Sequence, residues 1–171
     1  NIVENQLLRE GLSWELGLDY LLIQAAQEDG KKRLALENID QHLRLLISIP
    51  EPITIRAIDR ALLYPHILQR AQQRVIAAYR DRDIPQLVTY LFLGDREADR
   101  LYAPQDQAFW QLWKREQLLT QRNERWLPKI VGSLNQTPTF IAVGVGHLYG
   151  EKGLIKQLRQ LGFILTPIYL P

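Results

Sequence analysis

The residue best placed to do chemistry is His147, which stands alone among glycines in the stretch 140–153. Gly144, Gly146 and Gly150 allow positive φ and let a ligand approach the main chain closely. A loop that leaves a strand and enters a helix is also where open α/β sheets usually bind ligands. The three glycines are therefore predicted to form a cofactor-binding loop that presents His147. A histidine that only makes hydrogen bonds within a turn is the alternative.

Glu37 occupies a similar position earlier in the chain. It ends the run Arg-Leu-Ala-Leu-Glu, which is predicted to be a short strand, and it precedes Asn38, a favourable helix cap. Parallel strands aim their carboxyl ends at one crevice, so Glu37 and His147 are predicted to approach within about a nanometre of each other. A carboxylate that only stabilises the start of the next helix is the alternative.

Arg122 and Asn123 lie in a long helical pattern. Arg122, Trp126 and Ile130 recur at i, i+4 and i+8, which places the arginine on the apolar stripe of the helix. A cation in that position needs an anionic partner, either a ligand or a carboxylate such as Glu37. Arg122 and Asn123 are therefore candidate catalytic residues. The alternative is that they only support the strand ends through hydrogen bonds.

These side chains require elements that position them. Strands are predicted at Arg33–Glu37, Thr139–Val143 and Phe163–Tyr169, and a helix within Glu151–Leu161 joins the last two as parallel neighbours. The middle of the chain is almost entirely helical in pattern. The expected fold is α/β, or α+β, with a parallel-strand sheet and a large helical insert. It is expected to form a single domain over residues 1–171.

The composition excludes several classes of function. The 171 residues are 46% hydrophobic and suffice for one core, and the net charge of +2 is too small to favour nucleic acid. No apolar run is long enough to span a membrane. The absence of cysteine excludes thiolate catalysis, and no P-loop, dinucleotide or His-Glu-x-x-His motif occurs. Imidazole and carboxylate together leave metal-assisted or acid–base hydrolysis.

The glycine loop resembles the carboxyl-terminal signature of the TraB/GumN family. That family includes the Tiki metalloproteases and is related to the erythromycin-esterase and ChaN-like group. Its Gly-x-x-His and the Gly-Glu-x-Gly that follows are matched at 144–147 and 150–153. Leu36-Glu37 resembles the family's Leu-Glu. Gln121-Arg122-Asn123 resembles its Glu-Arg-Asn, with glutamine in place of the first glutamate.

The resemblance implies a metal-dependent hydrolase, of the peptidase kind, that acts on a peptide or small molecule. His147 and Glu37 would hold a divalent ion such as Mn²⁺, Co²⁺ or Zn²⁺, beside Arg122 and Asn123. Two other functions stay open: a non-catalytic module that binds a peptide or pheromone in the same cleft, and a haem- or iron-binding protein of the ChaN-like kind. A bacterial source, an extracytoplasmic location and a homo-oligomer are further expectations.

The chain departs from the family in lacking a first Gly-x-x-His. His42 and His66 lie in helical patterns without the required glycines and are interpreted as surface or packing residues. The sequence contains no methionine and begins at Asn1 within a helix-like pattern, so amino-terminal strands that would carry the second histidine are expected to be missing.

Overall fold

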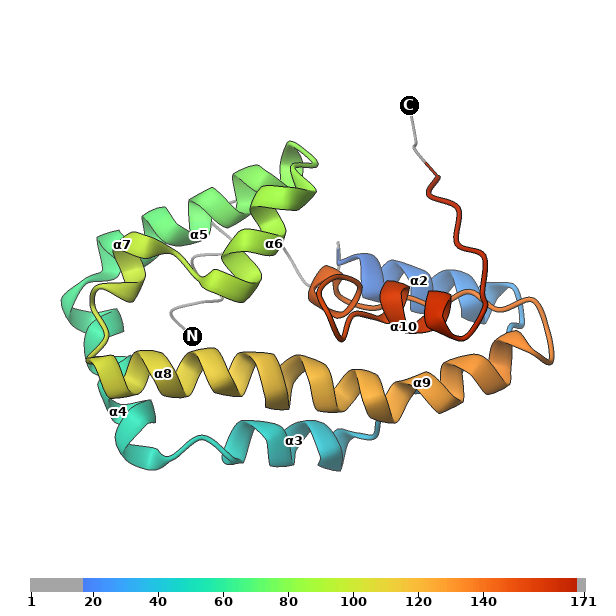
Figure 1. The fold of residues 1–171 in the computed structure, drawn as a ribbon, viewed down its shortest axis with the longest axis horizontal. Coiled ribbons are helices and arrows are strands. Elements are labelled where there is room, and N and C mark those ends of the chain that lie inside the picture. Colours follow the sequence, from blue (N-terminus) through green and yellow to red (C-terminus); the bar gives the residue numbers. More distant parts are fainter. Residues whose placement is uncertain (1–16, 169–171) are drawn as a thin grey trace. The chain divides into compact units, whose positions relative to one another are not determined.

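The structure is a computed structural model that describes residues 17–168, and Figure 1 shows them as helices joined by irregular segments. The chain divides into two compact units, Asn1–Leu36 and Glu37–Pro171. The described part of the first unit contains the helix α2 (Leu18–Glu28). Gly30, with φ +61°, follows the end of this helix, in the left-handed conformation that favours glycine.

None of the three predicted strands forms in the part of the chain that the structure describes. Residues 33–37, 139–143 and 163–168 are irregular and belong to no sheet, and Tyr169 lies outside the described residues. The prediction of an α/β or α+β fold with a parallel-strand sheet was therefore wrong. An apolar, β-branched run becomes a strand only when a second backbone pairs with its N–H and C=O groups, and no described segment does so.

The second unit contains one long helical rod (Figure 1). Three segments follow each other without a break: α8 (Pro104–Leu112), η1 (Trp113–Thr120) and α9 (Gln121–Leu134). The sequence predicted a long helix here, but not that η1 is a π-helix, the wider form with i→i+5 hydrogen bonds. Pro128 lies inside α9, which continues past it to Leu134.

Five helices precede the rod in the second unit, and prolines and caps mark their starts. They are α3 (Ile39–Ile47), α4 (Glu51–Leu63), α5 (Pro65–Arg80), α6 (Ile84–Leu93) and α7 (Arg96–Asp99). Pro65 is the first residue of α5, where the missing N–H costs nothing. Asp83 caps α6 by accepting a hydrogen bond from the Gln86 N–H at 3.0 Å. Both helix starts are therefore marked by residue types that favour them.

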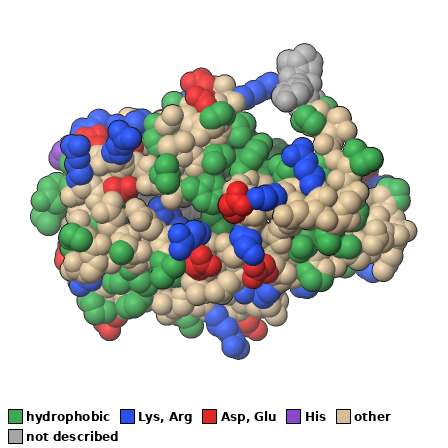
Figure 2. Space-filling model, in the orientation of Figure 1, with side chains coloured by type: hydrophobic (Ala, Val, Ile, Leu, Met, Phe, Trp, Pro, Cys, Tyr) green, Lys and Arg blue, Asp and Glu red, His purple; other side chains and the backbone are tan. Residues whose placement is uncertain are grey.

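The best-buried apolar side chains of the second unit include Trp126 and Ile130 of α9 and Leu154 of α10 (Leu154–Gln160). Other large apolar side chains remain exposed, including Phe140 at 78% and Ile164 at 94%. Figure 2 shows hydrophobic side chains at the surface among lysine, arginine and carboxylate groups. No helix within residues 17–168 is both long enough and apolar enough to cross a membrane.

Candidate functional site

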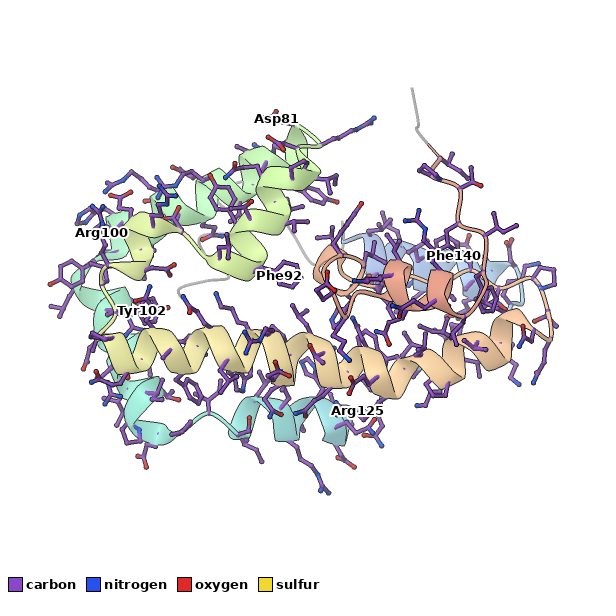
Figure 3. The ribbon with its side chains drawn as sticks, viewed as in Figure 1. Asp81, Phe92, Arg100, Tyr102, Arg125 and Phe140 are labelled. Carbon is purple, nitrogen blue, oxygen red and sulfur yellow. The ribbon has the colours of Figure 1, made fainter. Side chains whose placement is uncertain are left out.

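His147 is presented by a short turn that its own backbone closes. The 3-10 helix η2 (Val145–His147) begins after Gly144, whose carbonyl accepts a hydrogen bond from the His147 N–H at 2.9 Å. Gly146 is buried within this turn. Gly150 follows with φ +90°, a conformation that favours glycine, and a Cβ there would lie 3.3 Å from the ring of Phe92 on α6 (Figure 3). A cofactor-binding role for the three glycines stays a prediction.

Asn123 of α9 holds the imidazole of His147 in one orientation. Its Nδ2 donates hydrogen bonds to the carbonyls of His147 and Lys152, at 3.0 and 2.8 Å, which turns its Oδ1 toward the ring. That Oδ1 lies 2.7 Å from His147 Nδ1. Because an amide oxygen only accepts, Nδ1 carries the proton and Nε2 is left as a hydrogen-bond acceptor. Asn123 and His147 are only 2% and 7% exposed.

Arg122 is bonded to both groups that the sequence placed in the site. Its Nε and Nη2 donate to the two carboxylate oxygens of Glu37, at 3.1 and 2.6 Å. Its Nη1 donates to His147 Nε2 and to the Leu118 carbonyl, each at 3.2 Å. The guanidinium also lies 4.6 Å from the centre of the Trp126 ring. Glu37 is therefore the anion that the position of Arg122 required.

Glu37 is positioned by the start of α3. Asn38 accepts a hydrogen bond from the Gln41 N–H at 2.8 Å, and the Gln41 side chain accepts one from the Asn38 N–H at 2.9 Å. These reciprocal bonds fix the chain where Glu37 enters the helix. His42, one turn further on, lies with its Nδ1 3.5 Å from Glu37 Oε1. The sequence analysis missed this contact, which the spacing of His42 after the cap could have indicated.

Trp126 forms an apolar wall beside the imidazole. The centres of the Trp126 and His147 rings lie 4.4 Å apart, with the planes inclined by 41°. The indole Nε1 of Trp126 is buried and has no hydrogen-bond partner among the described residues. Trp126 is 5% exposed and is thus part of the buried core. It reduces the access of water to one side of the imidazole.

Burial and neighbouring charges decide the protonation states of the site. Burial first, and then the charge of Arg122, lower the pKa of His147 to about 4, although the Glu37 charge acts in the opposite direction. Burial would raise the pKa of Glu37, but hydrogen bonds and charge from Arg122, with a smaller contribution from His42, lower it below its usual value. At pH 7 the site therefore contains a carboxylate, a guanidinium and a neutral imidazole.

The structure thus brings together Glu37, Arg122, Asn123 and His147, but not by the route that the sequence suggested. A sheet edge was expected to gather them. Instead α9 supplies Arg122, which binds Glu37 just ahead of the Asn38 cap of α3, and Asn123, which binds His147, the last residue of η2. The catalytic roles of the four residues stay predictions.

The donor types in this site suit a divalent transition ion, but their arrangement does not. A neutral imidazole whose second nitrogen is held by a hydrogen bond is typical of a metal ligand, and a carboxylate is another. However, Arg122 is bonded to both Glu37 and His147 Nε2. The described residues also contain no group of three His, Cys, Asp or Glu side chains that could hold an ion. As arranged, these residues do not form a metal site by themselves.

Comparison with known proteins bears on the same residues. The profile of the TraB/PrgY/gumN family matches residues 2–167, as the glycine loop had predicted. The chain is 27% identical over 154 residues to the uncharacterized protein YbaP of Escherichia coli, covering 90% of this chain and 52% of YbaP. It is 26% identical to the metalloprotease TIKI homolog of Nematostella vectensis and to metalloprotease TIKI2 of Danio rerio. Each of these two alignments covers 85% of this chain, and 34% and 31% of the respective relative.

The chain therefore spans about half the length of YbaP and about a third of the two TIKI proteins. No solved structure matches it significantly.

Proposed function

Because the chain belongs to the TraB/PrgY/gumN family, we propose that it supplies a hydrolytic centre for peptide substrates, built on His147 with Glu37, Arg122 and Asn123. The names of the two TIKI relatives support the peptidase class for those proteins, and the proposal extends that class to this chain. The observation that carries the proposal is the neutral, singly oriented imidazole of His147 connected through Arg122 to the Glu37 carboxylate.

Each side chain has a role that follows from its contacts. His147 Nε2 carries the lone pair that would accept a proton from an attacking water once the Arg122 Nη1–H that bonds it turns to the substrate. Asn123 keeps that nitrogen unprotonated by holding the proton on Nδ1. The guanidinium of Arg122 would stabilise the negative charge that develops on the carbonyl oxygen of the substrate. Glu37 holds the guanidinium in place through two hydrogen bonds.

The low pKa of His147 makes the resting imidazole a weak base. Part of that low pKa comes from the charge of Arg122. A substrate oxygen that develops negative charge beside Arg122 would offset this charge, and the pKa of His147 would then rise toward its ordinary value. On this proposal the site gains basicity when the substrate is bound, which is when a base is needed.

The test is cleavage of a mixed peptide library by the purified chain, followed by mass spectrometry. His147→Ala is expected to lower the cleavage rate by about 100-fold or more, as loss of a general base does. His66→Ala is the matched control, because His66 is exposed at the start of α5 and away from the contacts described above; its rate should equal that of the wild type. Peptide binding without cleavage by the wild type would overturn the hydrolase and favour a binding module.

A further inference from the structure

We propose that the pocket between the loop 148–150 and α10 binds the carboxyl terminus of a peptide whose last residue has an apolar side chain. The pocket has a volume of about 460 Å³, and its lining includes the apolar Leu148 and Ile155 and the cationic Lys156 and Arg159. Leu148 directly follows His147, so the pocket begins beside the residue that carries the candidate base. The inference rests on the proposed function in taking a peptide as the substrate, and it adds which end of the peptide is recognised.

Contacts between the loop and α10 hold the walls of this pocket in place. The Ile155 N–H donates to the Leu148 carbonyl at 3.2 Å, and the Gly153 N–H donates to the Gly150 carbonyl at 3.0 Å. A Cβ at Gly153 would lie only 2.5 Å from the Leu148 carbonyl oxygen, so the loop packs directly on the start of α10. Walls that are fixed before a ligand arrives lower the entropic cost of binding.

One positive charge of the pocket has no partner. The Lys156 ammonium is bonded to the carboxylate of Glu151, but the guanidinium of Arg159 forms no ion pair or hydrogen bond with another of residues 17–168. Lys156 and Arg159 against Glu151 leave a net charge of +1 at pH 7. Two parallel N–H groups of an arginine match the two oxygens of a carboxylate. A singly charged carboxylate, rather than a doubly charged phosphate, therefore balances the charge of the pocket.

The apolar side of the pocket selects the kind of carboxylate. In a peptide with a free carboxyl terminus, the carboxylate and the last side chain are attached to the same Cα. Arg159 can therefore bind the carboxylate while Leu148 and Ile155 contact the side chain. Both apolar residues are half-buried and still have surface to cover, so an apolar last side chain adds to the affinity.

The experiment is an NMR titration of the purified chain with Ala-Ala-Leu, which has a free carboxylate, and with the same peptide as a carboxyl-terminal amide. The free acid is expected to bind about three- to fivefold more tightly, the effect of a solvent-accessible ion pair. Arg159→Gln should bind both peptides alike. Arg100→Gln is the matched control, because it removes the same charge from an exposed residue at the end of α7 (Figure 3) and should keep the wild-type preference.

Other probes distinguish the terminal carboxylate from other anions. Ala-Ala-Gly should bind more weakly than Ala-Ala-Leu, because it offers no side chain to Leu148 and Ile155. The amide of Ala-Ala-Asp has its carboxylate only on the side chain. If it binds as tightly as Ala-Ala-Leu, recognition of the terminus is overturned. Inorganic phosphate that binds as tightly as Ala-Ala-Leu would overturn the choice of a peptide.

Equal affinity of the wild type for the acid and the amide would overturn the proposal, as would folded Arg159→Gln that keeps the preference. If circular dichroism shows that Arg159→Gln does not fold, Lys156→Gln replaces it. This variant leaves Glu151 unpaired and lowers the net charge of the pocket to zero, so the preference should be lost, and a preference that persists would equally overturn the proposal.

Mass spectrometry of the titrated samples separates this proposal from the hydrolase. Binding of the intact free acid without any cleavage would count against the hydrolase alone. Cleavage of peptides without a preference for the free acid would count against the pocket alone.

Discussion

Two arginine–carboxylate pairs connect the rod to earlier parts of the second unit, and they have the same geometry at the carboxylate. Arg56 of α4 bonds Asp106 of α8 through Nε and Nη2, at 2.7 and 2.6 Å. Arg122 of α9 bonds Glu37, just before α3, through the same two nitrogens, at 3.1 and 2.6 Å. Each pair joins segments that are far apart in sequence. Bidentate bonds of this kind fix orientation as well as distance.

The pairs differ in their third partner. Beside Asp106 lies a second cation, Arg60, with Nη1 3.8 Å from the carboxylate and its guanidinium 3.6 Å from the centre of the Tyr102 ring. Beside Arg122 lies the neutral imidazole of His147. In the first cluster the Asp106 carboxylate neutralises buried arginine. In the second cluster the described hydrogen-bond partner of His147 Nε2 is the Nη1–H of Arg122, a donor that another molecule could replace. The same bond therefore stabilises the fold at one place and prepares chemistry at the other.

Removing the two carboxylates should separate these roles most clearly. Asp106→Ala is expected to lower the melting temperature by on the order of 15 °C, because it leaves Arg60 buried beside Arg56 without a carboxylate. Glu37→Ala should lower it less, since Arg122 keeps the Leu118 carbonyl as a partner. Calorimetry of both variants checks this. Equal losses would contradict the distinction between the two clusters.

The next largest effect is expected at Asn123. Asn123→Ala removes three hydrogen bonds from a residue that is 2% exposed and leaves the carbonyl and the Nδ1–H of His147 without partners, whereas the Lys152 carbonyl keeps the Gln157 side chain. The free energy of unfolding should fall by about 3 to 4 kcal/mol. Urea unfolding measures this loss. The His147 ring should also lose its single tautomer, which nitrogen-15 chemical shifts of the imidazole would reveal; an unchanged tautomer would show that Asn123 does not orient it.

A smaller effect is expected from acid. The pKa of His147 is about 4 in the folded chain and about 6.5 when exposed, so the unfolded state binds the proton first as the pH falls. Folding stability should therefore be complete above pH 6.5 and decrease between pH 6.5 and 4 by about 2 to 3 kcal/mol. Glu37, whose pKa is lowered, adds its own loss only below about pH 4.5.

Urea unfolding at intervals across this range measures the acid effect, and His147→Asn should lack the part of the loss above pH 4.5. Arg122→Gln should narrow the pH range over which stability is lost, because removing the Arg122 charge raises the pKa of His147 toward its value in the unfolded chain. A pH profile of Arg122→Gln identical to that of the wild type would contradict the assigned cause.

Local signals in the sequence predicted the helix boundaries, and non-local pairing explains the main error. Asn38 caps the helix that its residue type and position indicated. The run Phe140–Val143 had the composition of a strand, but a strand depends on a partner backbone that no local pattern encodes, and the described chain offers none. The spacing of Arg122, Trp126 and Ile130 at i, i+4 and i+8 predicted that Arg122 lies on the apolar side of the helix, because helical periodicity is a local property of the sequence.

The site was predicted better than the fold that supports it. Arg122 and Glu37 were paired by chemical need, a cation on an apolar stripe requiring an anion, and that requirement holds whichever fold brings them together. His147 was grouped with Glu37 through a sheet edge that does not form, and Arg122 joins the two instead. The contact of His42 was missed because it depends on the rotation of α3 after its cap, which residue type does not reveal.

The π-helix η1 also sets the angle around the rod between two side chains, Asp106 and Arg122. It lies between Asp106 and Arg122, and so its winding fixes the direction in which Arg122 leaves the rod relative to Asp106. One residue of an α-helix corresponds to a rotation of about 100°, so deleting a single residue within η1 would turn Arg122 away from Glu37 while Asp106 kept its bond to Arg56. The eight residues of η1 act as an angular spacer, so the position of Arg122 relative to Glu37 and His147 depends on a segment that contains none of the four candidate site residues.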